Sequence, residues 1–204
     1  MAEKRIYLAS RSPRRRELLK QIGVNFELLL LREDPRRGSD VDETPLSDEL
    51  PDAYALRVAS AKAAFAARQI MQRNLPQHPV LAADTTVVLD GQILGKPADA
   101  GHAIQMVQAL SGREHQVITA VAMARREQLE TRLSVSSVRF REIAEFDVRR
   151  YITSGEPFDK AGAYAIQGRA AAFITRIEGS YSGIMGLPLA ETAELLQRFG
   201  IEVL

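Results

Sequence analysis

Apolar positions along the chain follow two spacings, and each spacing predicts a different element. Short runs rich in β-branched residues predict strands, whereas apolar residues recurring about every 3.6 positions predict helices. Strands are expected at residues 6–9, 26–31, 80–89, 116–125, 129–141 and 173–177. Helices are expected at residues 13–22, 53–72, 98–111, 145–154 and 188–199. The polar segments 32–51 and 179–186 are expected to be loops.

The order of these elements predicts an α/β fold, a mixed twisted sheet with flanking helices. The two long strands 116–125 and 129–141 follow each other through a short charged turn, so they should pair antiparallel in an otherwise parallel arrangement. We find no internal repeat, linker or low-complexity tract in the 204 residues. A chain of this length can bury its own core, so we expect one domain over residues 1–204.

Asp84 is the most unusual residue in this pattern. It lies in the run VLAADTTVVLDGQILGKP, residues 80–97, in which a strand leads into a tight turn at Asp90-Gly91 and on to Lys96. A carboxylate in a buried strand is costly unless it is paired, hydrogen-bonded or bound to a metal. We therefore expect a positively charged partner for Asp84.

Lys62 is the first candidate partner. The helical stripe at positions 55, 58, 59, 62, 65, 66 and 69 is mostly Ala, Val and Phe, and Lys62 interrupts it. A lysine there either extends to the edge of the stripe or meets an anion. The second interpretation is favoured because the strand that carries Asp84 follows this helix.

A cationic site is also expected at the start of helix 13–22. Ser10 and Ser12 lie in the loop that joins a strand to this helix, and Ser12 is the expected N-cap. Free backbone N–H groups and the helix dipole attract anions there, and Arg14 and Arg15 add full charges. We interpret the junction as a phosphate site; the alternative is that the arginines only cover the helix surface.

Composition narrows the classes of function. The net charge of +1 argues against a globally basic nucleic-acid binder, and the absence of cysteine excludes disulfides, thiolate metal sites and a cysteine nucleophile. We read no signal peptide at the N-terminus and no apolar run of roughly 18 residues that would span a membrane. We therefore expect a cytoplasmic protein without a membrane or nucleic-acid partner.

The remaining polar residues suggest polyphosphate chemistry. The three histidines, His115 among them, lack a second histidine at ligand spacing and are interpreted as ordinary polar residues. The small-residue segment 159–168 lets backbone approach a ligand closely, and Lys160 and Gln167 are its polar side chains. Glu43 lies in an acidic loop that could help to hold a divalent cation, although such a loop is usually just solvated.

Cations outnumber acids among these candidates, which suits a polyphosphate carried with Mg²⁺ or Mn²⁺. The glycine-rich Walker signature is absent, so a P-loop enzyme is excluded.

Several motifs, taken in order, resemble the Maf family of nucleoside triphosphate pyrophosphatases. They are SRSPRRRELL, DVDET, the lysine of ASAKA, AADTTVVLDGQILGKP, DKAGAYAIQG and GLPL. The resemblance implies a cytoplasmic, metal-dependent enzyme, often a homodimer, that cleaves a nucleoside triphosphate to the monophosphate and pyrophosphate by water attack at the α-phosphorus. It also implies two lobes around a cleft, as in inosine triphosphate pyrophosphatases.

The resemblance assigns roles to residues that match the motifs. Asp84 becomes the general base that accepts a proton from water, and Glu43 becomes the second acid, with both carboxylates at the metal. The residues implied to line the phosphate path are Ser10, Arg14, Arg15, Lys62, Lys96 and Lys160. The segment 31–39, which links the second strand to the acidic motif, looks longer than is usual in the family, so Glu33 is an alternative candidate for the second acid. Glu43 is preferred because its DVDET context matches the family motif.

Three positions bear on substrate choice. Family members that act on dTTP and UTP carry arginine, threonine and glutamine where this chain has Arg14, Thr85 and Gln167, whereas members that prefer 7-methyl-GTP usually carry tryptophan, glutamine and glutamate. The resemblance therefore implies the dTTP/UTP branch. The alternatives are a pyrophosphatase for 7-methyl-GTP or another modified nucleotide, and a regulator of septum formation in cell division that acts through protein contact.

Overall fold

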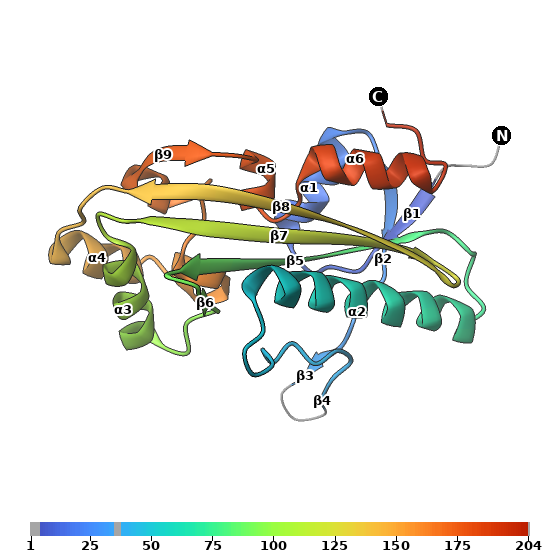
Figure 1. Ribbon diagram of the computed structural model, residues 1–204, viewed down its shortest axis with the longest axis horizontal. Coiled ribbons are helices and arrows are strands. Elements are labelled where there is room, and N and C mark those ends of the chain that lie inside the picture. The colour runs from blue at the N-terminus through green and yellow to red at the C-terminus, as the bar shows by residue number, and fades with distance from the viewer. Residues whose placement is uncertain (1–4, 35–37, 204) are drawn as a thin grey trace.

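The computed structural model describes residues 5–34 and 38–203, and its centre is a mixed β-sheet (Figure 1). Within these residues the strand order is β2-β1-β5-β7-β8-β9, with β6 paired to β5. The strands are β1 Arg5–Leu8, β2 Asn25–Leu28, β5 Val80–Leu89, β6 Gln92–Leu94, β7 Glu114–Arg125, β8 Gln128–Phe140 and β9 Ile174–Glu178. β1 is parallel to β2 and β5, whereas β5 to β9 pair antiparallel. The expected mixed α/β sheet is confirmed.

Helices cover both faces of this sheet. α2 runs along one face against β5, β7 and β8, and α1 and α6 pack on the opposite face (Figure 1). α3 and α4 pack together at the end of the molecule where β6 lies. The bounds are α1 Pro13–Gln21, α2 Pro51–Gln72, α3 Ala100–Leu110, α4 Glu145–Ile152, α5 Tyr181–Ile184 and α6 Leu189–Arg198.

Local signals explain where several elements begin and end. Pro13 is the first residue of α1, and Gly23 follows the helix with φ +71°, as a left-handed cap requires. Ser12 occupies the N-cap position, but its side chain makes no capping hydrogen bond; instead its backbone N–H donates to Ser10 Oγ at 3.2 Å. Asp90-Gly91 has positive φ at both residues, which fits a type I′ turn between β5 and β6.

The buried face of α2 differs from the expected stripe. The row that faces the sheet follows i, i+4 spacing, so positions 62, 65 and 69 lie at its margin instead of its centre. The buried residues of α2 are Ala55, Val58, Ala59, Ala63, Ala66, Ala67 and Ile70. This correction places Lys62 at the edge of the apolar face, where its ammonium group can reach the sheet edge without lying inside the core.

Two segments expected to be loops contain short elements. In segment 32–51, β3 Glu33–Asp34 pairs antiparallel with β4 Gly38–Ser39. Leu31 and Val41, on either side of this hairpin, are buried against the core beneath α2, which anchors a segment predicted to be exposed. The expected loop 179–186 contains the single helical turn α5.

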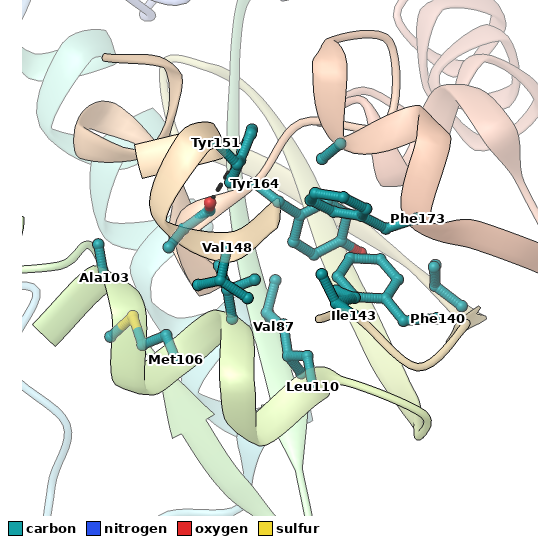
Figure 2. Close-up of a cluster of buried hydrophobic side chains, with 14 of the residues drawn as sticks. Val87, Ala103, Met106, Leu110, Phe140, Ile143, Val148, Tyr151, Tyr164 and Phe173 are labelled. Atoms are coloured by element: carbon teal, nitrogen blue, oxygen red, sulfur yellow. Dashed lines mark hydrogen bonds between the residues drawn. The ribbon is translucent and has the colours of Figure 1, made fainter. Parts of the chain in front are cut away.

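An aromatic cluster holds the end of the molecule around α3 and α4 together (Figure 2). The rings of Phe140 and Tyr164 lie edge to face at 4.9 Å, and those of Tyr151 and Phe173 at 5.4 Å. The Tyr151 hydroxyl also donates to the carbonyl of Ala163 at 3.2 Å. The 3₁₀ turns η2 Ala161–Ala163 and η3 Arg169–Phe173 contribute residues to this cluster, and η1 Glu156–Asp159 is linked to it by the hydrogen bond between Tyr151 and Glu156.

The middle of β5 has one open edge, and the site lies there. β1 pairs with β5 only at residues 80 and 81, and β6 pairs with it only at residues 87 to 89. In the part of the chain that the structure describes, residues 82–86 of β5 therefore have a strand partner, β7, on one side only.

None of the helices in the described residues has the length and apolar character needed to span a membrane.

Candidate active site

A cavity of about 570 Å³ lies at this open edge, between the end of the molecule that carries α1 and the end that carries the 3₁₀ turns. Its polar lining comes from the first loop and α1, from the acidic loop, from α2, from β5 and from the segments after β6 and α4. The expected cleft between two lobes is therefore present. The charged residues that line it are Arg11, Arg14, Arg15, Glu43, Lys62, Asp84, Lys96, Asp159 and Lys160.

Asp84, Lys62 and Glu43 form the centre of the polar lining. Lys62 Nζ donates to Asp84 Oδ1 at 2.8 Å and lies 2.9 Å from Glu43 Oε2. The Asp84 and Lys62 side chains are only 10% and 13% exposed, so this ion pair is largely shielded from water. The positive partner that the sequence requires for Asp84 is thus Lys62, which is shared with the second acid.

Glu43 is held by a braced loop. Arg57 on α2 contacts both oxygens of Glu49 at 2.6 and 2.8 Å and donates to the carbonyl of Thr44 at 3.0 Å. The Tyr54 hydroxyl donates to the carbonyl of Glu43 itself at 3.0 Å. Burial, together with the negative charges of Asp84 and Glu43, raises the pKa of Tyr54 to about 12, so this donor stays protonated.

Arg15 joins three parts of the chain. Its guanidinium group donates to the carbonyl of Gly186 at 2.7 Å, to the carbonyl of Ala83 at 2.9 Å, to Ser10 Oγ at 3.2 Å and to Thr85 Oγ1 at 3.1 Å. These bonds use most of the five guanidinium donors. Arg15 therefore braces the rim of the cavity in addition to supplying charge.

Further cations come from both sides of the cavity. Arg14 is half-buried at the start of α1, and Lys96 is exposed after β6. Lys160 Nζ donates to the carbonyl of Glu156 at 2.7 Å and pairs with Asp159. Burial raises the pKa of Asp159, but the hydrogen bond and charge of Lys160 and the charge of Arg14 outweigh it, so the pKa lies below its usual value.

The lining of the cavity also includes apolar side chains. They are Ile93, Val117, Tyr164, Ile166, Ile184 and Met185. Thr85, predicted as a specificity residue, lies among the lining residues, whereas Gln167 is exposed and is not one of them. A pocket with both charged and apolar lining suits a molecule with a polyanionic tail and a flat apolar head.

The cavity is also lined by Arg11, Tyr54 and Asp159, which were not singled out from the sequence. Tyr54 lies two helical turns before Lys62, so it could have been placed on the same side of α2. Asp159 directly precedes the predicted Lys160. His115 was interpreted as an ordinary polar residue, yet it is 3% exposed, its Nε2 lies 2.8 Å from the Tyr164 hydroxyl, and burial lowers its pKa to about 4.

The donor set fits a hard divalent cation in part. One oxygen of Asp84 and one of Glu43 lie within 2.9 Å of the same ammonium nitrogen, so both carboxylates are directed at one point. The structure places no three His, Cys, Asp or Glu residues together as metal ligands among those it describes. Mg²⁺ is commonly held by one or two carboxylates plus substrate phosphates and water, and this pair can supply the protein's share. The side chain of Glu33 lies outside the described residues.

The chain is similar to known proteins along nearly its whole length. A protein from Nitrosomonas europaea, named dTTP/UTP pyrophosphatase, is 60% identical over 97% of this chain and 96% of its own length. A protein of the same name from Aromatoleum aromaticum is 57% identical over 96% of each chain. The solved structure of a Staphylococcus aureus Ham1 protein matches 96% of this chain and 97% of its own length, with a TM-score of 0.49 and 17% identity. The model of the family described as Maf-like protein matches residues 5–199, and the chain therefore belongs to the Maf-like family.

Proposed function

We propose that this chain hydrolyses dTTP and UTP to the nucleoside monophosphate and pyrophosphate. The observation that carries the proposal is the convergence of Asp84 and Glu43 on Lys62 inside a cavity whose further lining includes several cations and apolar side chains. The relatives that are 60% and 57% identical are named for dTTP and UTP, which supports these substrates.

Asp84 is the proposed general base. A water molecule gives a proton to the Asp84 carboxylate, its oxygen bonds to the α-phosphorus, and the bond from that phosphorus to the oxygen bridging to the β-phosphate breaks. Pyrophosphate leaves with that oxygen. Lys62, which contacts both carboxylates, holds them in one orientation, and Tyr54 holds the backbone of Glu43.

Asp84 and Glu43 would also hold the metal, Mg²⁺ or Mn²⁺. When bound, such a cation supplies charge neutralisation at the phosphate oxygens. Arg14, Lys96 and Lys160 are the proposed contacts of the triphosphate chain, because they line the cavity from both sides. Ser10 and Arg15 would complete the path at the start of α1.

Arg14, Thr85 and Gln167 are the proposed specificity positions. Thr85 lines the cavity beside the apolar side chains that would contact the base. Gln167 is exposed, so a contact with substrate would require its side chain to turn toward the cavity. We further propose a cytoplasmic enzyme without a nucleic-acid partner, which the absence of cysteine and the near-neutral charge favour. We also propose one domain, which can form a homodimer as the resemblance to the family implies.

Pyrophosphate release with Mg²⁺ or Mn²⁺ tests the proposal. dTTP and UTP are expected to be the best substrates in a panel that includes 7-methyl-GTP and 5-methyl-UTP. Asp84→Asn should lower turnover by roughly 10²- to 10⁴-fold, the range typical of general base catalysis, while the melting temperature shows that the variant is folded.

Asp90→Asn is the matched control for this substitution. Asp90 directly follows the last residue of β5, in a turn where asparagine is equally suitable, and its side chain is 68% exposed. Its activity should remain that of the wild type. Faster hydrolysis of 7-methyl-GTP than of dTTP and UTP would assign the protein to the modified-nucleotide class, and failure on every nucleotide with metal present would refute the proposal.

A further inference from the structure

The ammonium group of Lys62 occupies the point at which the two acids of the cavity converge. Its Nζ lies 2.8 Å from Asp84 Oδ1 and 2.9 Å from Glu43 Oε2. Both distances are those of charge-assisted hydrogen bonds. The two carboxylates that are proposed to hold a divalent cation therefore already share one positive charge, which the protein itself supplies.

Little water screens these three charges from one another. The Asp84 and Lys62 side chains are largely buried, and only Glu43, with 38% of its side chain exposed, opens more widely to solvent. Charges in such a setting interact more strongly than charges on an open surface. An ammonium group and a divalent cation at the same two carboxylates must therefore repel each other, whichever carboxylate oxygens the metal contacts.

The placement of Lys62 allows its ammonium group to change partners. The residue lies at the margin of the buried face of α2, and the residues about one turn away, Ala59 and Ala66, have small side chains. Its four-carbon stem is flexible. Lys62 also lines the cavity together with Arg14 and Lys96, which are proposed to contact the triphosphate. Phosphate oxygens in this cavity would give the ammonium group new acceptors without a movement of α2.

We propose that Lys62 excludes free metal from the site. Its ammonium group holds Asp84 and Glu43 together in the nucleotide-free protein and moves to phosphate oxygens when the metal arrives with a nucleoside triphosphate. A divalent cation alone has to displace the ammonium group and offers it no other anion, whereas a metal–nucleotide complex offers phosphate oxygens in exchange. Lys62 thus couples the binding of metal to the binding of nucleotide. The inference deepens the proposed function and rests on its assignment of both carboxylates to the metal.

Mn²⁺ binding to the nucleotide-free protein, measured by electron paramagnetic resonance, tests this exclusion without turnover. Lys62→Met removes the charge and nearly keeps the length of the side chain, so Mn²⁺ should bind about 10-fold more tightly than to the wild type, or better. Lys62→Gln should change the affinity in the same direction by about 3-fold or more, because its amide can still donate to one carboxylate. A Lys62→Met affinity no tighter than that of the wild type would overturn the proposal.

Lys96→Met is the matched control. Lys96 lines the same cavity and carries the same charge, but it is exposed, so solvent screens its effect on a metal at the carboxylates. The Mn²⁺ affinity of this variant should stay within about 3-fold of the wild type. An equal gain in Lys96→Met and Lys62→Met would show that the loss of any positive charge in the cavity is sufficient, and would remove the special role of Lys62.

Stability is measured first, because removal of the ammonium group leaves two acids close together. The melting temperature shows whether each variant is folded. If neither Lys62 variant folds, a crystal structure of the wild type with Mn²⁺ and α,β-imido-UTP decides. The proposal requires Lys62 Nζ to lie at a phosphate oxygen there, and an Nζ still within hydrogen-bond distance of both carboxylates beside the bound metal refutes it.

Pyrophosphate release from UTP, measured in parallel, separates this inference from the proposed function. Tighter Mn²⁺ binding by Lys62→Met in a protein whose wild type hydrolyses no nucleotide would remove the proposed reaction and leave the role of Lys62. Hydrolysis of UTP by the wild type, together with an unchanged Mn²⁺ affinity in Lys62→Met, would leave the reaction and remove the exclusion of metal.

Discussion

His115 shows how burial controls a single residue of this protein. Its Nε2 contacts the Tyr164 hydroxyl at 2.8 Å, its ring meets that of Phe140 edge to face at 5.0 Å, and its Nδ1 has no hydrogen-bond partner among the described residues. Burial lowers the pKa from 6.5 to about 4. The protein therefore folds around a neutral imidazole next to an aromatic side chain that lines the cavity.

This burial predicts a loss of stability in acid. The unfolded chain binds a proton at His115 below pH 6.5, whereas the folded chain binds it only near pH 4, so unfolding is favoured as the pH falls through that window. The pKa shift corresponds to a loss of about 3 kcal/mol in the free energy of unfolding, and this loss is complete near pH 4. Urea unfolding at pH 7 and pH 4.5 should show a smaller loss for His115→Gln than for the wild type. Equal losses in the two proteins would contradict the prediction.

At the scale of elements, Gly162 lets the turn η2 rest on β5. Its φ is +65°, and a Cβ atom there would lie 2.8 Å from Val87 Cγ1. Its N–H donates to the carbonyl of Gly95 at 3.0 Å, which ties the turn to the segment that carries Lys96. The turn and this segment are thus joined beside Lys160 and Lys96, which both line the cavity.

Gly162→Ala and Gly155→Ala separate the cost of a side chain at positive φ from the cost of its contact with Val87. Gly155 also has a positive φ, +77°, but nothing lies within 4 Å of a Cβ atom there. Gly155→Ala should cost about 1 kcal/mol of unfolding free energy from backbone strain alone. Gly162→Ala adds a clash with Val87 and should cost about 2 to 4 kcal/mol. Denaturant unfolding measures both, and equal costs would show that Val87 moves aside freely.

At the scale of the whole molecule, Arg15 connects segments that are distant in the sequence. Arg15 lies near the N-terminus, and its side chain donates to the carbonyl of Ala83 on β5 and to the carbonyl of Gly186, which is 171 positions away in the sequence. Both ends of the chain are therefore tied to the open edge of the sheet. α1 and α6, which flank these contacts, pack against the same face (Figure 1).

Arg15→Lys tests this connection. Lysine keeps the charge but cannot form the planar fork, so several partly buried carbonyl and hydroxyl acceptors lose their donor. We expect a loss of about 2 to 4 kcal/mol of unfolding free energy and weaker nucleotide binding. Arg149→Lys, at an exposed i, i+4 pair with Glu145, should cost less than about 0.5 kcal/mol. If Arg15→Lys loses no more unfolding free energy than Arg149→Lys, then only the charge of Arg15 matters for stability.

Much of the local structure could be predicted because its causes are local. The turn at Asp90-Gly91, the left-handed Gly23 and the long strands follow from residues that are neighbours in the sequence. Segments with mixed signals were less predictable. The exposed character expected for residues 32–51 was wrong at Val41, because a single isolated apolar residue carries no periodic signal and only the neighbouring α2 gives it a place to be buried.

The sequence by itself determined the order of the elements, the mixed sheet and most of the charged residues that line the cavity, because periodicity, turn residues and motifs are written in consecutive positions. Only the tertiary structure decided which of these residues meet. Lys62 lies between Asp84 and Glu43 because α2 packs along β5, and Thr119 reaches Gly183, 64 positions later, because α5 folds back on β7. Such contacts depend on how separate elements pack, which no local pattern contains.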